Sequence, residues 1–330
     1  MKKFLSVLML ALLLVVFTGC SSRTFVADGT YAAWKLTSTS SNLLLADGTT
    51  AKDSAGTVIK VNTPVIVTVE VLIQNDKIVS YNIDELQSKP YVAVDKTTKL
   101  PKYDAETGVV SGVTWEWNAM TKKELEYGYG METQAAQGEW FIQALAIENY
   151  WLENGIVDET TPITGATIHY NDYAEVANKA VQNAKDGIVS AITDKEHYTY
   201  DVTYVTGKIN KDGKISDIKL DAHLFGNTNA NTYVVGHADY LKFDWNAESK
   251  YASYPEMNGK KWQDQIDTLN AYINEYGWDG SLMSGNATNS TKGINKRGEA
   301  VDALSTVTVQ TYREVLVMNK LLKYFPQAWK

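Results

Sequence analysis

Cysteine is almost absent from this sequence, and its absence excludes several kinds of site. The 330 residues contain a single cysteine, Cys20. One thiol cannot form an intramolecular disulfide, and it cannot supply the cysteine ligands of a structural zinc site. Because the rest of the chain has no thiol, a cysteine nucleophile in its body is excluded as well.

Positive charge is also in short supply. Lysine and arginine number 31 against 39 aspartates and glutamates, which gives a formal net charge of -8. An acidic chain lacks the basic surface that binds a phosphate backbone, so we expect no nucleic-acid partner.

Motifs for hydrolysis, nucleotide binding and metal binding are missing too. The sequence contains no Gly-x-Ser-x-Gly elbow, no Walker loop and no dinucleotide fingerprint. No two of its four histidines stand four residues apart, as metal ligands on one helix would: His169, His197, His223 and His237. We therefore expect no metal site and no catalytic residue of these classes.

The one long apolar run lies at the start of the chain, from Phe4 to Phe17. About 14 residues are fewer than the roughly 20 that a membrane-spanning helix needs. Two lysines precede the run and Thr-Gly-Cys follows it, which is typical of a lipoprotein signal. We predict that 1–19 is a signal peptide, that Cys20 carries lipid, and that 20–27 is a linker. The protein is then expected outside the cytoplasm, at the cell membrane surface, with membrane lipid as a partner.

Two stretches of the chain align with each other without a gap. They are GEWFIQALAIENYWLENG (138–155) and KKWQDQIDTLNAYINEYG (260–277), and Trp140 matches Trp262. In both, apolar residues recur at spacings of 4, 3 and 4, and a glycine closes the stretch. The pattern predicts two amphipathic helices of about four turns, each ended by a C-cap glycine.

The segments before these helices also correspond. Residues 65–84 alternate apolar and polar side chains on both sides of Asn75-Asp76, which predicts a β-hairpin. Residues 198–221 repeat the plan around Asp212-Gly213. Each unit therefore combines a hairpin with helices, and the fold class is predicted to be α+β with two tandem units.

The downstream segments complete the correspondence. YAEVANKAV (173–181) matches EVLVMNKLL (314–322), and both have a helical pattern. We predict a first domain over 28–190 and a second, degenerate one over 197–330. The copies differ by polar insertions that read as irregular, one around 87–116 and one over 279–298.

Three short motifs resemble the FMN-binding domain family. They are Asp-Gly-Thr-Tyr at 28–31, Asn-Asp-Lys-Ile at 75–78, and Thr-Gly-Ala-Thr at 164–167 ahead of a helix. The family occurs in flavin-carrying subunits of sodium-pumping and Rnf-type oxidoreductases, and in surface lipoproteins of extracellular electron transfer. The resemblance spans nearly the whole chain after the signal, as two copies.

The resemblance implies a covalent cofactor. In the family, the last threonine of the motif carries FMN through a phosphoester bond made by a separate flavin transferase. Here that residue is Thr167, with Thr164, Gly165 and Ala166 before it and His169 two residues after it. The two small residues would let the loop enter the transferase. A flavin supplies the redox chemistry, and the protein orients it.

Both copies depart from the family motif. Thr161 stands six residues before Thr167, where the family has aspartate. The second copy keeps the aspartate but has Thr306-Val307 where the first has Gly-Ala, so Thr308 is the second candidate attachment residue. A β-branched pair adds bulk and stiffness where access is needed.

Two further features would serve an attached flavin. Asn171 or Asp172 is predicted as the N-cap of the next helix, whose backbone N–H groups would face the phosphate. Tyr-Gly-Tyr-Gly-Met at 127–131 would present tyrosine rings to a flat ligand, or would be an irregular turn that closes the core.

Two functions from different classes follow. The first is an electron-transfer flavoprotein with FMN on Thr167, between a membrane electron donor and an extracellular acceptor. The second is an unmodified surface lipoprotein with a binding or structural role on the same duplicated fold.

Overall fold

The computed structural model describes most of the chain after the predicted signal peptide. The described residues are 23–133, 135–193, 201–225, 248–256, 259–280, 304, 307 and 311–329. The predicted signal peptide, Cys20 and Thr308 lie outside them, as do 281–298 of the predicted second insertion.

The first half of the chain forms a four-stranded antiparallel sheet in the order β1-β2-β3-β6. Its strands are β1 (Gly29–Asn42), β2 (Lys60–Gln74), β3 (Lys77–Val92) and β6 (Val113–Trp117). Side chains alternate between the faces of a strand, so Val65 and Val67 of β2 enter the main core while Ile66 enters a smaller one. The predicted hairpin is confirmed.

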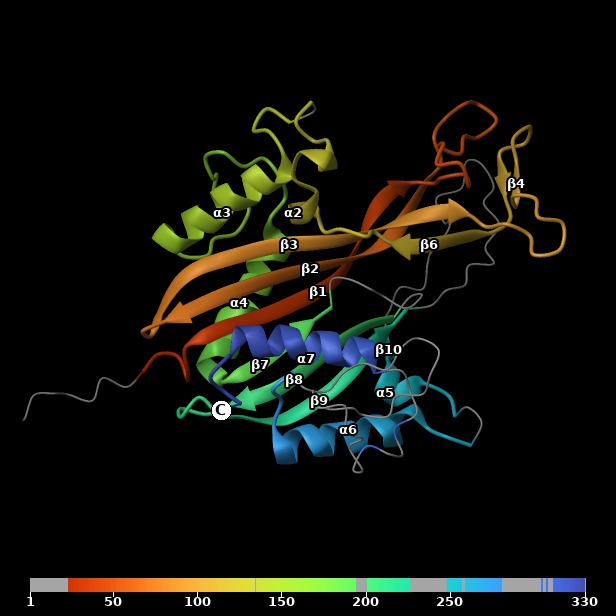
Figure 1. The fold of residues 1–330 in the computed structure, drawn as a ribbon. Helices are drawn as coiled ribbons and strands as arrows, with labels where there is room; N and C mark the ends of the chain where they lie inside the picture. The colour runs from red at the N-terminus through yellow and green to blue at the C-terminus, as the bar shows by residue number, and fades with distance from the viewer. Residues whose placement is uncertain are drawn as a thin grey trace, which may run out of the picture.

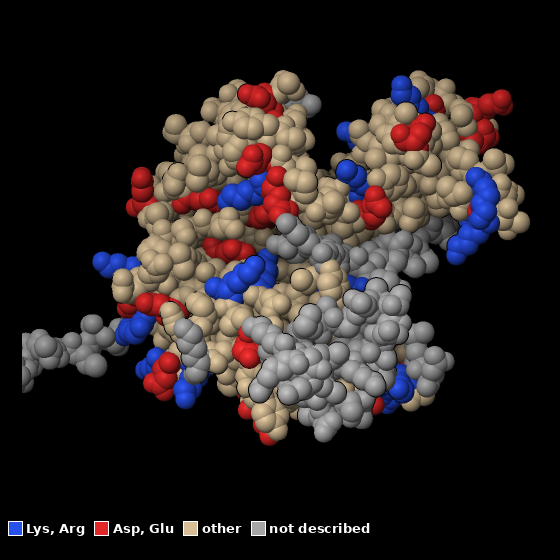
Figure 2. All heavy atoms as spheres, in the orientation of Figure 1, with Lys and Arg blue, Asp and Glu red and all other residues tan. Residues whose placement is uncertain are grey.

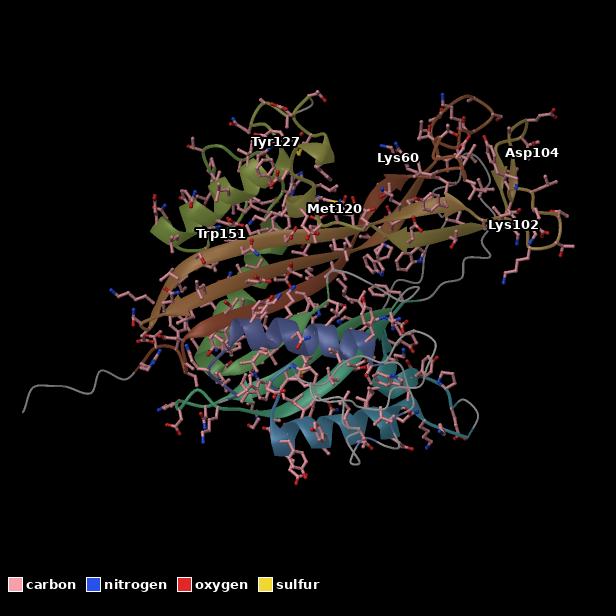
Figure 3. The ribbon with its side chains drawn as sticks, viewed as in Figure 1. Lys60, Lys102, Asp104, Met120, Tyr127 and Trp151 are labelled. Carbon is pink, nitrogen blue, oxygen red and sulfur yellow. The ribbon has the colours of Figure 1, made fainter. Side chains whose placement is uncertain are left out.

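Helices cover this sheet (Figure 1). They are α2 (Lys122–Leu125), the 3₁₀ helix η1 (Glu126–Tyr129), α3 (Trp140–Asn154) and α4 (Asn171–Asp186). Helix α3 packs on β3, and α4 packs on β1 and β2. The predicted helix at 138–155 is confirmed, and Gly155 ends it with a φ of 86°. Trp151 lies on α3 beside β3 and is buried (Figure 3).

The second half repeats this order of elements. Its antiparallel sheet has the order β10-β9-β8-β7, from β7 (Ile188–Ile192), β8 (Asp201–Ile209), β9 (Ile215–Leu224) and β10 (Glu248–Ser249). Its helices are α5 (Lys250–Ser253), α6 (Trp262–Tyr276) and α7 (Tyr312–Tyr324). The second hairpin and both remaining helices are confirmed, and the fold class is α+β.

Acidic side chains fix the first hairpin turn. Asn75 and Asp76 have φ values of 51° and 61°, the left-handed pair that a tight two-residue hairpin turn requires. The Asp28 carboxylate accepts hydrogen bonds from both of their N–H groups, at 2.8 and 3.3 Å. Asp28, just before β1, therefore holds the turn that follows the end of the neighbouring strand β2.

The segment before Asp28 is packed on the fold. The N–H groups of Thr24 and Phe25 donate to the Asp76 carboxylate at 3.0 and 2.9 Å, and the Phe25 ring is buried in the main core. Residues 23–27, which we expected to belong to a linker, are thus tied to the hairpin by hydrogen bonds and burial.

The first insertion contains regular structure, which corrects the expectation for 87–116. Besides the end of β3 and β6, it holds β4 (Tyr103–Asp104) and β5 (Val109–Val110), a small hairpin that projects from the molecule (Figures 1 and 3). Asp95 and Asp104 turn the chain there by accepting backbone N–H bonds from residues two and three positions on. The polar composition of this segment predicted a loop, although β4 and β5 pair with each other in a two-stranded sheet.

The two halves share one hydrophobic core. It contains side chains of both sheets and of α3, α4, α6 and α7. Helix α7 contacts β7 and β8 and also reaches β1. The ring of Tyr31 packs edge-on against Phe325 at 5.0 Å between centroids. A Cβ on Gly29 would lie 2.4 Å from that phenylalanine ring, so only glycine fits there.

The predicted limit at 190 falls inside β7, whose residues pair with β8 in the second sheet. Gly187 ends α4 with a φ of 69°, and a Cβ there would lie 2.5 Å from the carbonyl oxygen of Ile209. The chain therefore passes from the first set of elements to the second at Gly187.

Among the described residues, no helix has the length and apolar character needed to cross a membrane.

On the face in Figure 2, acidic and basic side chains are interspersed, and a notch separates the projecting hairpin from the lobe of α2 and α3.

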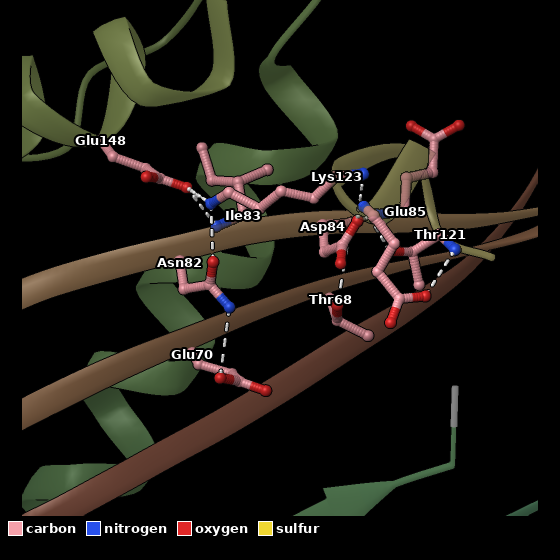
Figure 4. A network of polar contacts seen from close by, with 10 residues as sticks. Thr68, Glu70, Asn82, Ile83, Asp84, Glu85, Thr121, Lys123 and Glu148 are labelled. Atoms are coloured by element: carbon pink, nitrogen blue, oxygen red, sulfur yellow. Dashed lines mark hydrogen bonds and ion pairs between the residues drawn. The ribbon is translucent and has the colours of Figure 1, made fainter. Parts of the chain in front are cut away.

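A buried polar network anchors α2 to the sheet (Figure 4). The Asp84 carboxylate accepts from the Lys123 N–H at 3.1 Å, and the Lys123 ammonium donates to Asn82 and Glu148, each at 2.6 Å. Glu148 of α3 also accepts from the N–H of Ile83 at 2.6 Å. Burial raises the pKa of both Asp84 and Glu148, although hydrogen bonds and Lys123 oppose that rise.

A three-ring contact joins β1 to the second sheet. The Trp34 indole N–H donates to Nε2 of His223 at 2.9 Å, and the His223 ring stacks on Tyr204 at 4.5 Å between centroids. Burial lowers the pKa of His223 from 6.5 to about 4, although the Asp221 carboxylate opposes this. Protonation would also remove the acceptor of the indole N–H.

We predict that His223 makes stability depend on pH. The pKa of His223 is lower in the folded state than in the unfolded state. The stability that the neutral ring contributes is therefore complete above pH 6.5 and is lost as the pH falls towards 4. The loss should reach about 3 kcal/mol at 1.36 kcal/mol per pKa unit. Urea unfolding of wild type and His223→Gln at several pH values measures it, because glutamine keeps a neutral acceptor for Trp34.

His169→Gln is the matched control, because the His169 side chain is 98% exposed. It should keep the loss of stability that His223 causes as the pH falls from 6.5 towards 4. A His223→Gln variant with the same loss of stability between pH 6.5 and 4 as wild type would refute the assignment.

Candidate functional site

The Thr-Gly-Ala-Thr motif forms a tight turn on the surface. The N–H of Ala166 donates to the carbonyl of Ile163 at 3.1 Å, and Gly165, at the third position of the turn, has a φ of 89°. A side chain there would be strained and would also lie 3.3 Å from the Cβ of Ala146 in α3. The turn itself therefore requires glycine at this position.

One buried amide holds the residue after the turn. The side-chain oxygen of Gln143 accepts from the N–H of Thr167 at 2.8 Å, from its hydroxyl at 3.1 Å, and from the N–H of Ile168 at 3.2 Å. The Gln143 amide nitrogen donates to the carbonyl of Gly138 at 2.9 Å. Because Gln143 is fully buried on α3, the helix fixes the position of Thr167.

Thr167 is exposed at the edge of a cavity. The cavity has a volume of about 560 Å³, within the roughly 300–1,000 Å³ of ordinary ligand pockets. It lies between the polar end of β1, the inner face of β2 and β3, and the start of α4. The side chains that matter below are those of Glu85, Lys122, Tyr129, Trp140, Thr167 and Tyr173.

A charged and aromatic cluster forms the inner wall of this cavity. The Lys122 ammonium pairs with the Glu85 carboxylate at 2.8 Å, and their side chains are only 11% and 8% exposed. The same ammonium lies 5.1 Å from the ring centroid of Tyr129 and 5.3 Å from that of Trp140. Such distances give favourable cation–π contacts.

Tyr173 of α4 completes the cluster. Its hydroxyl donates to Glu85 at 2.6 Å and accepts from the Trp140 indole N–H at 3.3 Å. Burial raises the pKa of Tyr173 well above 10, and the neighbouring Glu85 charge adds to this. The hydroxyl therefore stays protonated and remains a donor.

The start of α4 differs from the prediction. The N-cap is Tyr170, which has no capping side chain, instead of Asn171 or Asp172. The Glu159 carboxylate accepts from the N–H groups of Tyr170 and Asn171 at 2.6 and 3.2 Å. These first two amides are therefore already bonded, which corrects the expectation that they would face a phosphate.

Glu159 also reaches His169, with 3.2 Å between its carboxylate and the ring Nδ1. Burial opposes ionisation of Glu159, but hydrogen bonds from Asn171, His169 and Tyr170 outweigh it and lower the pKa of Glu159. This acid lies two positions before the place of the family aspartate, and the loop still brings it to the cavity rim.

The sequence-predicted residues fall into two groups. Thr164, Gly165, Ala166 and Thr167 lie on the turn, and His169 lines the cavity with its ring in solvent. In the 127–131 segment, Tyr129 and Met131 also line the cavity. Tyr127 does not; it packs edge-on against Phe141 and is 62% exposed.

Sequence reasoning missed Gln143, Lys122 and Glu85. A signal existed for the first, because Gln143 and Gln265 occupy the same position in the aligned helices and both are buried. A glutamine three residues after a buried tryptophan on the inner face of a helix needs a polar partner. No pattern marked Lys122 or Glu85.

The second half contains a counterpart of the cluster. Lys250 pairs with Asp201 at 2.6 Å and lies 4.7 and 5.2 Å from the ring centroids of Tyr254 and Trp262. Glu314 occupies the position on α7 that Tyr173 has on α4. It is buried, and burial raises its pKa. The arrangement of lysine over two rings is thus present twice.

The turn recurs as well. The N–H of Val307 donates to the carbonyl of Leu304 at 3.0 Å, as Ala166 does to Ile163. Leu304 and Val307, which make this hydrogen bond, are both buried. Thr308, which follows it, lies outside the described residues.

Within the described part of the chain, no three His, Cys, Asp or Glu side chains come close enough to hold a metal ion.

Comparison with known proteins adds little. No family model and no curated protein matches the chain. A solution NMR structure of a Clostridium thermocellum protein, a structural genomics target, aligns at 22% identity over 48% of this chain and 91% of its own, with a TM-score of 0.21. At that TM-score the likeness carries no weight for the fold or the site.

We predict that Gln143→Leu lowers the free energy of unfolding by about 2 kcal/mol, because two backbone N–H groups lose their acceptor in a part-buried loop. Urea unfolding measures the change. The control is Gln182→Leu, at an exposed position of α4. Among the described residues the Gln182 side chain donates only to Asp186, so its loss should change the free energy of unfolding by less than about 0.5 kcal/mol. Equal effects of the two variants would contradict this role for Gln143.

Proposed function

We propose that this chain is an exported, lipid-anchored flavoprotein that carries electrons outside the cytoplasmic membrane, with FMN attached to Thr167 through a phosphoester. The observation that carries the proposal is the position of the Thr167 hydroxyl. Thr167 is an exposed residue directly after a glycine-containing turn, and it lies at the edge of a cavity lined by aromatic side chains. A modifying enzyme can reach it, and a ring attached there has a cavity beside it.

The local chemistry supports attachment by a separate flavin transferase. The Thr167 hydroxyl donates to the Gln143 amide oxygen, which cannot take up its proton at neutral pH. The transferase must therefore supply the base. The threonine oxygen would form a bond to the flavin phosphorus, the bond from phosphorus to its leaving group in the donor would break, and the hydroxyl proton would pass to that base.

The described residues also fit the cofactor once it is attached. Bound FMN would supply one- and two-electron transfer. The partly buried Tyr129 and Met131 offer apolar surface to the cavity. Gln143 orients the attachment residue, and Glu159 keeps His169 at the rim. The Glu159 carboxylate would repel a phosphate at the first amides of α4, so the phosphate is expected on the solvent side of Thr167.

The wider hypothesis has three parts. The chain would consist of two tandem FMN-binding-like units, the second degenerate. Thr308 would be a second attachment residue in that unit. The carrier would accept electrons from a membrane donor and pass them to an extracellular acceptor, with Cys20 as the anchor in membrane lipid.

The attachment is tested by co-expressing the chain with a flavin transferase. We expect flavin fluorescence that survives a denaturing gel, and an intact mass increased by one flavin phosphate. Thr167→Val removes the hydroxyl at nearly constant shape and should abolish attachment at that residue. Thr164→Val, at an exposed threonine of the same turn, should leave it unchanged.

Thr308→Val separates the two attachment residues, since any fluorescence left in Thr167→Val must vanish in the double variant. A colourless wild-type chain of unmodified mass would overturn the proposal and favour the unmodified surface lipoprotein.

The anchor is tested separately. Cys20→Ala should abolish incorporation of labelled fatty acid and release the protein from the membrane fraction, because no other cysteine can carry lipid. Equal labelling of the variant and the wild type would contradict lipidation at Cys20.

A further inference from the structure

Lys122 is the one lysine or arginine among the described residues that line the cavity beside Thr167. Its ammonium is fixed from three sides, by the Glu85 carboxylate and by the rings of Tyr129 and Trp140. Tyr173 holds Glu85 in turn with a hydrogen bond of 2.6 Å. These contacts therefore hold the Lys122 charge in one position at the inner wall of the cavity.

We infer that Lys122, through its fixed positive charge, stabilises the reduced form of a flavin ring in this cavity. The inference rests on the proposed function. On reduction at neutral pH, a flavin takes up two electrons and one proton, so the ring gains one negative charge at N1 and C2=O. The electrons come from the membrane donor, or from dithionite in the experiment below, and leave to the outer acceptor. A nearby fixed cation favours the charged, reduced form.

Burial makes this effect large enough to measure. Lys122 and Glu85 are both nearly enclosed, so solvent and salt screen their charges weakly. Glu85 acts in the opposite direction, because its negative charge disfavours an anionic ring. The two residues should therefore change the reduction potential with opposite signs, whereas a purely structural ion pair would give no such opposition.

The second half supplies a matched control. Lys250 has the same contacts, an acidic partner at 2.6 Å and two aromatic rings, but it does not line the cavity beside Thr167. Losing Lys250 removes a comparable buried ion pair from the shared fold. It should leave the flavin on Thr167 unaffected.

The experiment uses the full chain, flavinylated by co-expression with a transferase and carrying Thr308→Val so that a single flavin is present. Dithionite titration against reference dyes gives the reduction potential of wild type, Lys122→Met, Lys122→Arg, Glu85→Gln and Lys250→Met. Circular dichroism and the melting temperature report whether each variant folds.

We expect Lys122→Met to lower the equilibrium constant for reduction at least tenfold, a fall of about 30 mV for a two-electron couple. Lys122→Arg should restore most of the change, Glu85→Gln should raise the potential, and Lys250→Met should leave it within error of wild type. If Lys122→Met does not fold, the upward shift in Glu85→Gln decides the question.

Two failures are distinguishable. A flavinylated protein whose potential moves by less than threefold in the folded Lys122 and Glu85 variants, or in the same direction in both, would overturn the role of Lys122 and leave the flavoprotein proposal intact. A wild-type chain that carries no covalent flavin would overturn the proposed function, and this inference with it.

Discussion

The three hydrogen bonds accepted by the buried Gln143 oxygen are the constraint on which the site depends. They connect a rigid helix to a surface turn, so Thr167 is held while its side chain stays exposed. The turn hydrogen bond alone would not fix the residue after it, so the Thr167 hydroxyl could take several positions. Because the loop is tied to α3, the Thr167 side chain has one fixed position.

The site and the fold are coupled because the same helix serves both. The inner face of α3 carries Trp140 and Trp151 into the core, and Gln143, on the same buried face, reaches the turn. The polar cluster of Lys122, Glu85 and Tyr173 lies beside this core and is itself nearly closed to water. Its geometry is therefore set by packing, and a change of one partner leaves the others buried and poorly compensated.

Much of the fold could be predicted from the sequence, and the reasons are local. Alternation around Asn75-Asp76 and the 4-3-4 spacing after Trp140 each report one buried face, and both predictions were confirmed. The prediction of an irregular insertion was wrong because β4 and β5 are only two residues long and pair with each other, which is too short for an alternating pattern to show. Of the site, the turn residues are visible in the sequence. Lys122 and Glu85 are 37 residues apart and meet only through tertiary packing, so no local pattern marks them.

The contact between Gly29 and Phe325 has a consequence for how the chain is made. The first residue of β1 is covered by a ring that lies 296 residues later in the sequence. During synthesis, this contact can form only after residue 325 has been added to the chain. Until then the Tyr31 ring lacks its edge-on partner, so this part of the shared core is completed late.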